Sequence, residues 1–459
     1  MTTPPGVPSS APSPADLAAY VDAAKRLLAH GGYERTGSAA AARDWGFAHI
    51  TAYLDAHGRP DARPSSHVAG TKGKGSVATI AEAIVRASGA RTLLMTSPDL
   101  HSARERITID GVPIGHAAFA EAARFVLDDP ATAGWSYFEL LTVMGWLAGA
   151  QAGCDWNIVE VGLGGRLDTT NAMQSKTAAV ITPIDYEHMA ILGDTIVKIA
   201  GEKAGIITGP IPVIAAPMRA SAIEVFRARC VEVGATLHEV ATQCALRVQS
   251  RGLDGQTIDL RTPLRTYRAL RTSLLGQHQA ENIATAVRAV EEAFAARGEE
   301  LPEVAVTQGV EAVRMPGRAE VIRRRPLTIV DGLHTPLAAK RFREALDALP
   351  VPKRRVWVVG MLGGRPIEPI LEPLIGQGDD VMVAPPPSER AADVGDIVRA
   401  ARDLGALPQR AKSVAEAIDR ATEQAGERGA VVVCGSLYTV AAAREHLLAV
   451  MSDHALGIR

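Results

Sequence analysis

The sequence has few cysteines, and they form no arrangement that would build a metal or disulfide site. Cys154, Cys230, Cys244 and Cys434 are widely spread, and none belongs to a CxxC pair. A scaffold held together by disulfides and a thiolate zinc site are therefore both excluded. This cysteine usage predicts a chain that works in the cytoplasm.

The sequence also lacks long apolar runs and an excess of charge. No apolar stretch approaches the roughly 18 residues that a membrane span needs, and the 459 residues carry a net charge of −2. Residues 1–14 are rich in Pro, Ser and Thr, without the basic start and apolar centre of a signal peptide, and predict a disordered tail. We expect neither a membrane nor a nucleic acid as partner.

The sequence does contain a glycine-rich loop after a short apolar run that ends at Ala69. Residues 70–75 read GTKGKG, and Ser76 opens a segment with apolar residues at helical spacing. In such a loop, backbone N–H groups converge on an anion, and Lys74 can reach the terminal phosphates of a nucleotide. The strict pattern G-x-x-x-x-G-K-[ST] is not met, because Val68 and Gly75 stand at two of its fixed positions. A nucleotide loop and a surface turn both remain open at this point.

A carboxylate stands at the end of a second buried strand. Residues 156–159 (WNIV) are predicted to form a buried strand, Glu160 follows, and three glycines occur within the next five residues. A carboxylate in that position beside a nucleotide loop is typical of a Mg²⁺ ligand in phosphoryl-transfer sites. The alternative is a helix cap or a surface ion pair.

Two further strands end in polar residues that could reach the same place. Ser97 follows a strand predicted over residues 92–95, and His188 follows one predicted over residues 178–184. Ligands of open α/β sheets collect at the carboxyl ends of the strands, so both are candidate ligands. A lone loop serine is more often a turn residue, and magnesium prefers oxygen to imidazole.

The order of elements predicts two α/β domains after the tail, at residues 15–314 and 318–459. Amphipathic helices are expected over residues 15–30 and 39–57, and a small antiparallel patch over residues 237–275. The second domain is expected to interleave strands and helices. The strands are predicted over 319–323, 327–330, 355–360, 380–384 and 430–434, and the helices over 338–349, 367–375, 395–404, 414–424 and 439–450.

Several separated stretches together resemble the folylpolyglutamate synthase and dihydrofolate synthase family, relatives of the Mur ligases. They occur in the family's order and extend from Gly70 to Val440. The stretches are GTKGKGSV, TSPDLHSARERI, SYFELLT, EVGLGGRLDTTN, DYEHMAILGDT with EKAGII, GQHQAEN, MPGRAE, DGLHTP and GSLYTV. The resemblance implies a P-loop NTPase-like Mur ligase central domain followed by a smaller Rossmann-like α/β C-terminal domain, and the run RLD looks most like the bifunctional bacterial members.

The resemblance also implies roles for individual residues. Lys74, Glu160, His188 and Lys203 would serve catalysis, and Ser97, Glu160 and His188 would hold Mg²⁺. Lys203 matches a lysine that is carbamylated in the family, and a second Mg²⁺ is compatible with the pattern. ATP would be bound by Gly70, Thr71, Lys72, Gly73, Lys74, Gly75, Ser76, Asn282, Arg318, Asp331 and His334, and the pterin by Ser136, Phe138, Arg166 and Asp168.

This chain departs from the family's motifs at four places. Lys72 replaces an asparagine, Asp99 stands where an aromatic residue or His is common, and Thr335 replaces the asparagine of Asp-Gly-Ala-His-Asn. Residues 363–366 read GGRP, where a charged segment ending in Asp-Lys-Asp is usual. These departures put nucleotide contacts and one polar edge of the second domain in doubt.

The implied function is an ATP-dependent ligase that adds L-glutamate to dihydropteroate or to the glutamate tail of a tetrahydrofolate. Activation would pass through an acyl phosphate, and the chain is expected to act as a monomer. Two alternatives remain: a Mur-type ligase that joins a different carboxylate and amino acid, and a non-catalytic ATP-binding module. The retained Glu160, His188 and Lys203 argue against the second alternative.

Overall fold

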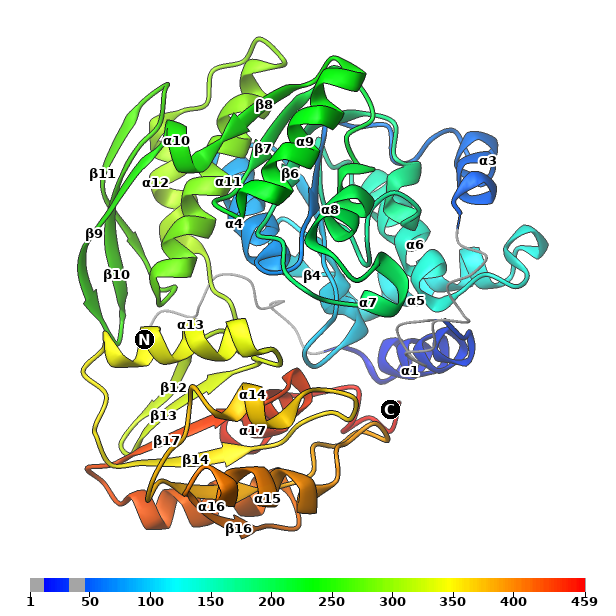
Figure 1. The fold of residues 1–459 in the computed structure, drawn as a ribbon. Helices are drawn as coiled ribbons and strands as arrows, with labels where there is room; N and C mark the ends of the chain where they lie inside the picture. The colour runs from blue at the N-terminus through cyan, green and yellow to red at the C-terminus, as the bar shows by residue number, and fades with distance from the viewer. Residues whose placement is uncertain (1–11, 33–45, 459) are drawn as a thin grey trace.

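The computed structural model describes residues 12–32 and 46–458, and contains two α/β units, each built on its own sheet. The larger unit carries an eight-stranded sheet in the order β4-β3-β2-β5-β1-β6-β7-β8. In Figure 1 this unit lies above the smaller one. Its strands are β1 (Ser65–Ala69), β2 (Thr92–Met95), β3 (Ile107–Ile109), β4 (Val112–Pro113), β5 (Trp156–Glu160), β6 (Lys176–Ile181), β7 (Pro212–Ala215) and β8 (Thr236–Glu239).

Six strands of this sheet, β2, β5, β1, β6, β7 and β8, run parallel, so their carboxyl ends meet at one edge. Every residue of the central strands β1, β2 and β5 is buried, as expected for strands covered by helices on both faces. Successive residues alternate between the covering layers: Val68 joins the core under α4 (Lys74–Ala87), and Ala69 joins the core under α8 (Ile196–Ala204). A parallel sheet with helices on both sides places its ligand site at the carboxyl edge.

Helices of the larger unit cover both faces of the sheet (Figure 1). Those that pack with α4 are α11 (Gln277–Ala295) and α12 (Glu303–Ala312). The others are α1 (Pro14–Ala29), α3 (Ala48–Ala56), α5 (His116–Leu127), α6 (Tyr137–Gln151), α7 (Met189–Leu192), α9 (Ala220–Val233) and α10 (Val240–Gln243). No helix in the described ranges is both long and apolar enough to cross a membrane.

A separate three-stranded antiparallel sheet precedes α11. It consists of β9 (Ala245–Gly252), β10 (Gly255–Arg261) and β11 (Thr266–Thr272), in the order β11-β10-β9. Its buried side chains alternate along β10, as expected when one face packs on helices and the other faces solvent. The antiparallel patch predicted over residues 237–275 is thus confirmed, although its first residues belong to β8, which pairs with β7 in the main sheet.

The smaller unit has a six-stranded sheet in the order β12-β13-β17-β14-β15-β16, with only β12 antiparallel. The strands are β12 (Glu320–Arg324), β13 (Leu327–Asp331), β14 (Arg355–Val359), β15 (Asp380–Val383), β16 (Leu407–Arg410) and β17 (Ala430–Cys434). The helices are α13 (Pro336–Asp347), α14 (Ile367–Leu371), α15 (Val394–Asp403), α16 (Val414–Ala425) and α17 (Leu437–Leu448). The carboxyl end of β13 is Asp331, so this sheet also presents a carboxylate at its ligand edge.

The end of the chain returns from the smaller unit to the larger one (Figure 1). The Tyr20 hydroxyl donates to Asp453 at 2.6 Å, and the Ala103 N–H donates to the other carboxylate oxygen of Asp453 at 2.9 Å. Ile458 is buried in the core formed by α1, α5 and α6. The two units are therefore joined by this terminal segment as well as by the connection after α12.

Several predicted boundaries are corrected. The helix expected over residues 39–57 begins only at Ala48, and residues 39–45 lie outside the described ranges. β6 ends at Ile181 rather than residue 184, because Pro183 has no N–H for the ladder. Of the tail predicted over residues 1–14, residues 1–11 lie outside the described ranges, whereas Ser13 caps α1 and Pro14 is its first residue.

Candidate active site

The glycine loop joins β1 to α4 at the carboxyl edge of the main sheet. Gly73 has a left-handed φ of 88°, and it starts the helix at Lys74, two residues earlier than predicted. At Gly70 a Cβ atom would lie 1.8 Å from the Thr182 hydroxyl oxygen, so the backbone packs closer to Thr182, the residue after β6, than any side chain would permit. Lys74 therefore stands in the first turn of a helix whose N-terminus opens into the cavity.

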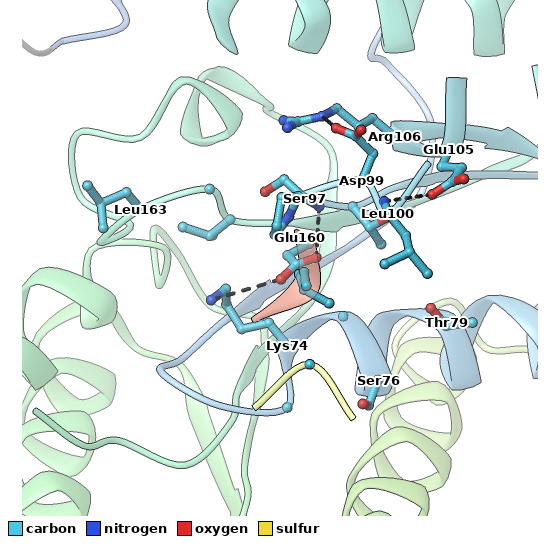
Figure 2. A pocket seen from close by; sticks show the side chains of 18 of the residues that line it. Lys74, Ser76, Thr79, Ser97, Asp99, Leu100, Glu105, Arg106, Glu160 and Leu163 are labelled. Carbon is cyan, nitrogen blue, oxygen red and sulfur yellow. Dashed lines mark hydrogen bonds and ion pairs between the residues drawn. The ribbon is translucent and has the colours of Figure 1, made fainter. Parts of the chain in front are cut away.

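Glu160 faces this loop from the end of β5. Its Oε1 is 3.9 Å from Lys74 Nζ, and its Oε2 accepts a hydrogen bond of 3.1 Å from the Ser97 N–H. Figure 2 shows Lys74 and Ser97 on either side of this carboxylate. Burial raises the pKa of Glu160, and the charge of Lys74 opposes that shift. A buried carboxylate with a single cation 3.9 Å away has capacity for a further positive partner.

Lys203 lies under the loop, on α8. Its ammonium is almost fully buried and donates to the Gly70 carbonyl at 2.7 Å. Burial lowers the pKa of Lys203 to about 7, and the nearby charge of Lys74 lowers it further in the same direction. A substantial fraction of this side chain is therefore a neutral amine near neutral pH.

A polar cluster links three separate segments beside the loop. Lys72 Nζ donates to Glu187 Oε1 at 3.1 Å and lies 3.4 Å from His334 Nε2, which belongs to the smaller unit. Burial raises the pKa of Glu187, but its contact with His334 and the charge of Lys72 outweigh burial and hold the pKa well below its usual range. Burial also lowers the pKa of His334 and of His188 to about 4. Both imidazoles are therefore neutral at neutral pH.

The smaller unit contributes a carboxylate at the end of β13. Asp331 accepts hydrogen bonds of 2.8 Å from the N–H groups of Ala319 and Leu333, one on each oxygen. Burial raises the pKa of Asp331 to about 6, against the charge of Arg318. These bonds fix the turn that carries Arg318 and the loop that carries His334.

The predicted pterin residues form a second part of the site. Phe138 packs against Gly162, where a Cβ atom would lie 2.4 Å from the tip of the ring, and Ser136 caps α6. Asp168 accepts from the Leu163 N–H at 2.8 Å, and burial raises its pKa. Arg166 is placed differently: its half-exposed guanidinium pairs with Glu202 at 2.9 Å and does not line the cavity.

One cavity of about 2070 Å³ contains nearly all of these groups. The predicted residues that line it are Gly70, Thr71, Lys72, Gly73, Lys74, Gly75, Ser76, Ser97, Ser136, Phe138, Glu160, Asp168, His188, Lys203, Asn282, Arg318, Asp331 and His334. Arg166 is the predicted residue outside it. The sequence reasoning missed Glu187, although this residue neighbours His188 at the end of a strand, which was the available signal.

The fit of Mg²⁺ can be judged from the donors present. In the described residues, no three His, Cys, Asp or Glu side chains gather into a metal-binding group. Magnesium in phosphoryl-transfer sites is held by one or two carboxylates together with phosphates and water, so it needs no such group. Glu160, buried and with a raised pKa, fits that use, and the Ser97 hydroxyl offers a second oxygen.

Comparisons with known proteins agree on one family. The Mur ligase middle domain matches residues 68–290, and the Mur ligase glutamate ligase domain matches residues 317–437. A dihydrofolate synthase/folylpolyglutamate synthase of Mycobacterium tuberculosis is 36% identical over 432 residues, with 86% of this chain and 88% of that protein covered. The Escherichia coli protein of the same name is 31% identical, with 82% and 84% covered.

Solved structures give the same result. The structure of M. tuberculosis folylpolyglutamate synthase complexed with ADP and AMPPCP has a TM-score of 0.82 and 33% identity, with 94% of this chain and 98% of that chain covered. E. coli FolC in complex with DHPP and ADP has a TM-score of 0.79 and 30% identity, with the same coverage. The similarity therefore extends over both units and the cavity between them.

Proposed function

The chain belongs to the dihydrofolate synthase/folylpolyglutamate synthase family of Mur ligases, and from this premise we propose that it is an ATP-dependent ligase that attaches L-glutamate to a pteroate or folate carboxylate. The observation that carries the proposal is the single cavity in which the glycine loop, Lys74 and Glu160 face Arg318, Asp331 and His334 of the smaller unit. A second arm of the same cavity contains Phe138 and Asp168, which suit a flat heterocycle with N–H donors.

The first step activates an unreactive carboxylate. A carboxylate oxygen attacks the γ-phosphorus of ATP, the bond from this phosphorus to the β–γ bridging oxygen breaks, and ADP leaves with the electron pair. Such a transfer needs positioning and neutralisation of charge more than covalent help. Lys74 at the helix N-terminus and Arg318 from the smaller unit supply positive charge where the transferred group would lie.

In the second step the glutamate amine attacks the acyl carbon, the C–N bond forms, and inorganic phosphate leaves as the amine loses its proton. Water would destroy the acyl phosphate, so the cavity must be closed during this interval. The two units enclose the cavity from opposite sides, and Lys72, Glu187 and His334 bring them into direct contact. We propose that the named residues of one chain complete the site, with functional units at residues 15–314 and 318–459.

We propose that Glu160, Ser97 and His188 hold Mg²⁺. When bound, the ion would neutralise phosphate charge. Glu160 supports this assignment because its carboxylate is buried and the Lys74 ammonium is 3.9 Å away, too far for a tight ion pair. Replacement of Glu160 by Gln should weaken the Mg²⁺ dependence of nucleotide binding, which titration calorimetry with ADP at varied Mg²⁺ measures independently of turnover.

We further propose that Lys203 forms a carbamate, since a buried neutral amine is the form that reacts with CO₂. Lys176 is a matched control: burial also lowers its pKa to about 7, but its ammonium donates to Asn171, Ile206 and Thr208 oxygens. ¹³C-NMR after incubation with labelled bicarbonate should show a carbamate signal that Lys203→Met abolishes and Lys176→Met retains. A signal that survives Lys203→Met would refute the assignment.

The decisive test of function is ADP release. We expect release that depends on both L-glutamate and dihydropteroate or tetrahydrofolate. Parallel assays with other carboxylates separate this activity from a Mur-type ligase of different specificity. Nucleotide binding without amine-dependent turnover would show a binding module instead.

A further inference from the structure

A fully buried histidine lies on β1, two residues before Ala69 ends the strand. His67 has no exposed surface, and its Nε2 lies 2.9 Å from the Thr170 hydroxyl oxygen. Its other ring nitrogen, Nδ1, has no hydrogen-bond partner in the part of the chain that the structure describes. A buried polar atom without a partner is costly, and a well-packed apolar side chain would avoid that cost. The contact of Nε2 with Thr170 is therefore the feature that can explain why a histidine occupies this buried position.

The contacts of Thr170 determine which tautomer His67 adopts. The Thr170 hydroxyl donates its single hydrogen to Asp168 Oδ1 in a short bond. It must then accept from His67, because a hydroxyl has one hydrogen to give. His67 therefore carries its proton on Nε2, and the unpartnered Nδ1 is a bare acceptor. Burial holds the pKa of His67 well below its usual range, so the ring is neutral.

Thr170 in turn fixes the carboxylate of Asp168. Its backbone N–H donates to Asp168 Oδ1 at 3.0 Å, in addition to the hydroxyl, while the Leu163 N–H holds Oδ2 at 2.8 Å. With both oxygens held, the carboxylate plane has one orientation. These three bonds fill both lone pairs of Oδ1 and one of Oδ2. Asp168 lines the cavity, so the remaining lone pair of Oδ2 is available to a ligand.

The chain of bonds begins on the strand that leads into the glycine loop. His67 pairs with Val159 of β5 and Ala179 of β6 in the centre of the sheet, so its backbone cannot shift alone. The His67 ring therefore connects the strand that precedes the glycine loop to the segment that carries Thr170 and Asp168. This contact fixes the position of Asp168 relative to the glycine loop.

We propose that His67 and Thr170 are positioning residues that set Oδ2 of the Asp168 carboxylate to accept one N–H donor of a ligand, such as the ring N–H or the exocyclic amine of a 2-amino-4-oxo heterocycle. This inference rests on the proposed function, because it assumes that Asp168 contacts the pteroate. It adds two residues that touch neither substrate nor nucleotide.

The test compares Thr170→Val, which keeps the shape and removes the hydroxyl, with Thr170→Ser, which keeps the hydroxyl. We expect Thr170→Val to raise the KM for dihydropteroate about tenfold, the effect of one hydrogen bond, and Thr170→Ser to restore a KM within about twofold of wild type. The KM for ATP and the calorimetric Kd for Mg-ADP should stay unchanged in both. Thr328→Val, which removes another buried hydroxyl in β13, controls for a loss of stability alone.

The proposal is overturned if Thr170→Val leaves the KM for dihydropteroate unchanged, if Thr170→Ser is equally impaired, or if the KM for ATP rises in parallel. Should Thr170→Val fail to fold, ¹⁵N-histidine NMR of the wild type still decides, because a proton on Nδ1 of His67 contradicts the relay. Failure of the proposed function is separate: the wild type itself would then release no ADP with any pteroate.

Discussion

The two units contribute to the cavity in different ways. The larger unit holds its reactive groups on a sheet whose strands are buried on both faces, with Lys74, Glu160 and Lys203 on adjacent elements. The smaller unit places Arg318 and His334 on turns that depend on the two backbone bonds of Asp331. From this comparison we expect the larger unit to position the groups for phosphoryl transfer and the smaller unit to complete the site.

The junction between the two units beside the cavity is polar. Polar contacts across the junction include the pair of Arg341 with Glu281 at 3.1 Å and the bond from Arg444 to His101 at 3.1 Å. Interfaces of this polar kind permit relative motion of domains. Substitutions in the larger unit should therefore have the largest effects, and substitutions at the junction the smallest.

The largest effect is expected from Lys74→Ala. Loss of a preorganised charge contact should lower kcat/KM about 10³-fold or more, which corresponds to about 4 kcal/mol. Steady-state ADP release measures this, and Lys198→Ala, an exposed lysine on α8, is the control with unchanged activity. Full activity of Lys74→Ala with an unchanged KM for ATP would contradict the assignment of the loop.

The next effect tests how rigidly the larger unit holds its loop. Gly70→Ala would place a methyl group on the Thr182 hydroxyl at a backbone φ of 145°, and should cost about 2–3 kcal/mol of unfolding free energy and weaken nucleotide binding. Denaturant unfolding measures the cost. Gly201→Ala on α8, where nothing lies within 4 Å, should be neutral or slightly stabilising. Equal stability of the two variants would contradict the close packing of the loop.

In the smaller unit, Asp331→Asn should raise the KM for ATP about tenfold, because one of the two backbone bonds is lost. The change also tests a pH dependence. The pKa of Asp331 is raised in the folded state to about 6, so its contribution to stability is full below about pH 4 and is lost as pH rises through 6. The stability of wild type relative to Asp331→Asn, from denaturation at pH 4 to 7, should fall over that window. A flat difference would contradict the burial of this carboxylate.

The smallest effect is expected at the junction. Lys72→Asn removes the ammonium that contacts both Glu187 and His334, and should change kcat/KM less than about fivefold, as the loss of a partly exposed ion pair does. In the absence of nucleotide, amide hydrogen exchange in the loop around His334 should be faster in Lys72→Asn than in the wild type. Lys412→Asn, an exposed change elsewhere in the smaller unit, controls for charge alone. A loss as large as that of Lys74→Ala would show that Lys72 acts on the phosphates directly.

Local patterns in the sequence predicted most of the fold. Buried strands such as residues 92–95 and 430–434 consist almost entirely of apolar residues, and their predicted bounds agree with the structure. The strand β16 was missed, because Leu407–Arg410 is a polar edge strand that contains a proline. Helix α14 ends at Leu371 rather than at residue 375, since Pro373 follows it closely.

The spacing of residues predicted the parts of the candidate site that follow strands, such as Glu160 and Ser97, and the resemblance added residues on helices and turns, such as Lys203. Strand order could not be read from the chain, so the contact of Lys72 with His334, 262 residues apart, was not foreseen. The outward turn of Arg166 was also missed, because its partner Glu202 belongs to a separate stretch of the sequence, and the spacing of the two stretches does not show that they pair. The relay from His67 through Thr170 needs side-chain geometry that no spacing encodes.

The return of the terminal segment to the larger unit has a mechanical consequence. Two crossings of the backbone, one after α12 and one at Asp453, attach the smaller unit at separate points. A domain attached at two points can rotate about the line that joins them, whereas a domain attached at one point can rotate in any direction. We therefore expect any rotation of the smaller unit, and of Arg318 and His334 with it, to occur mainly about the line that joins the two attachments.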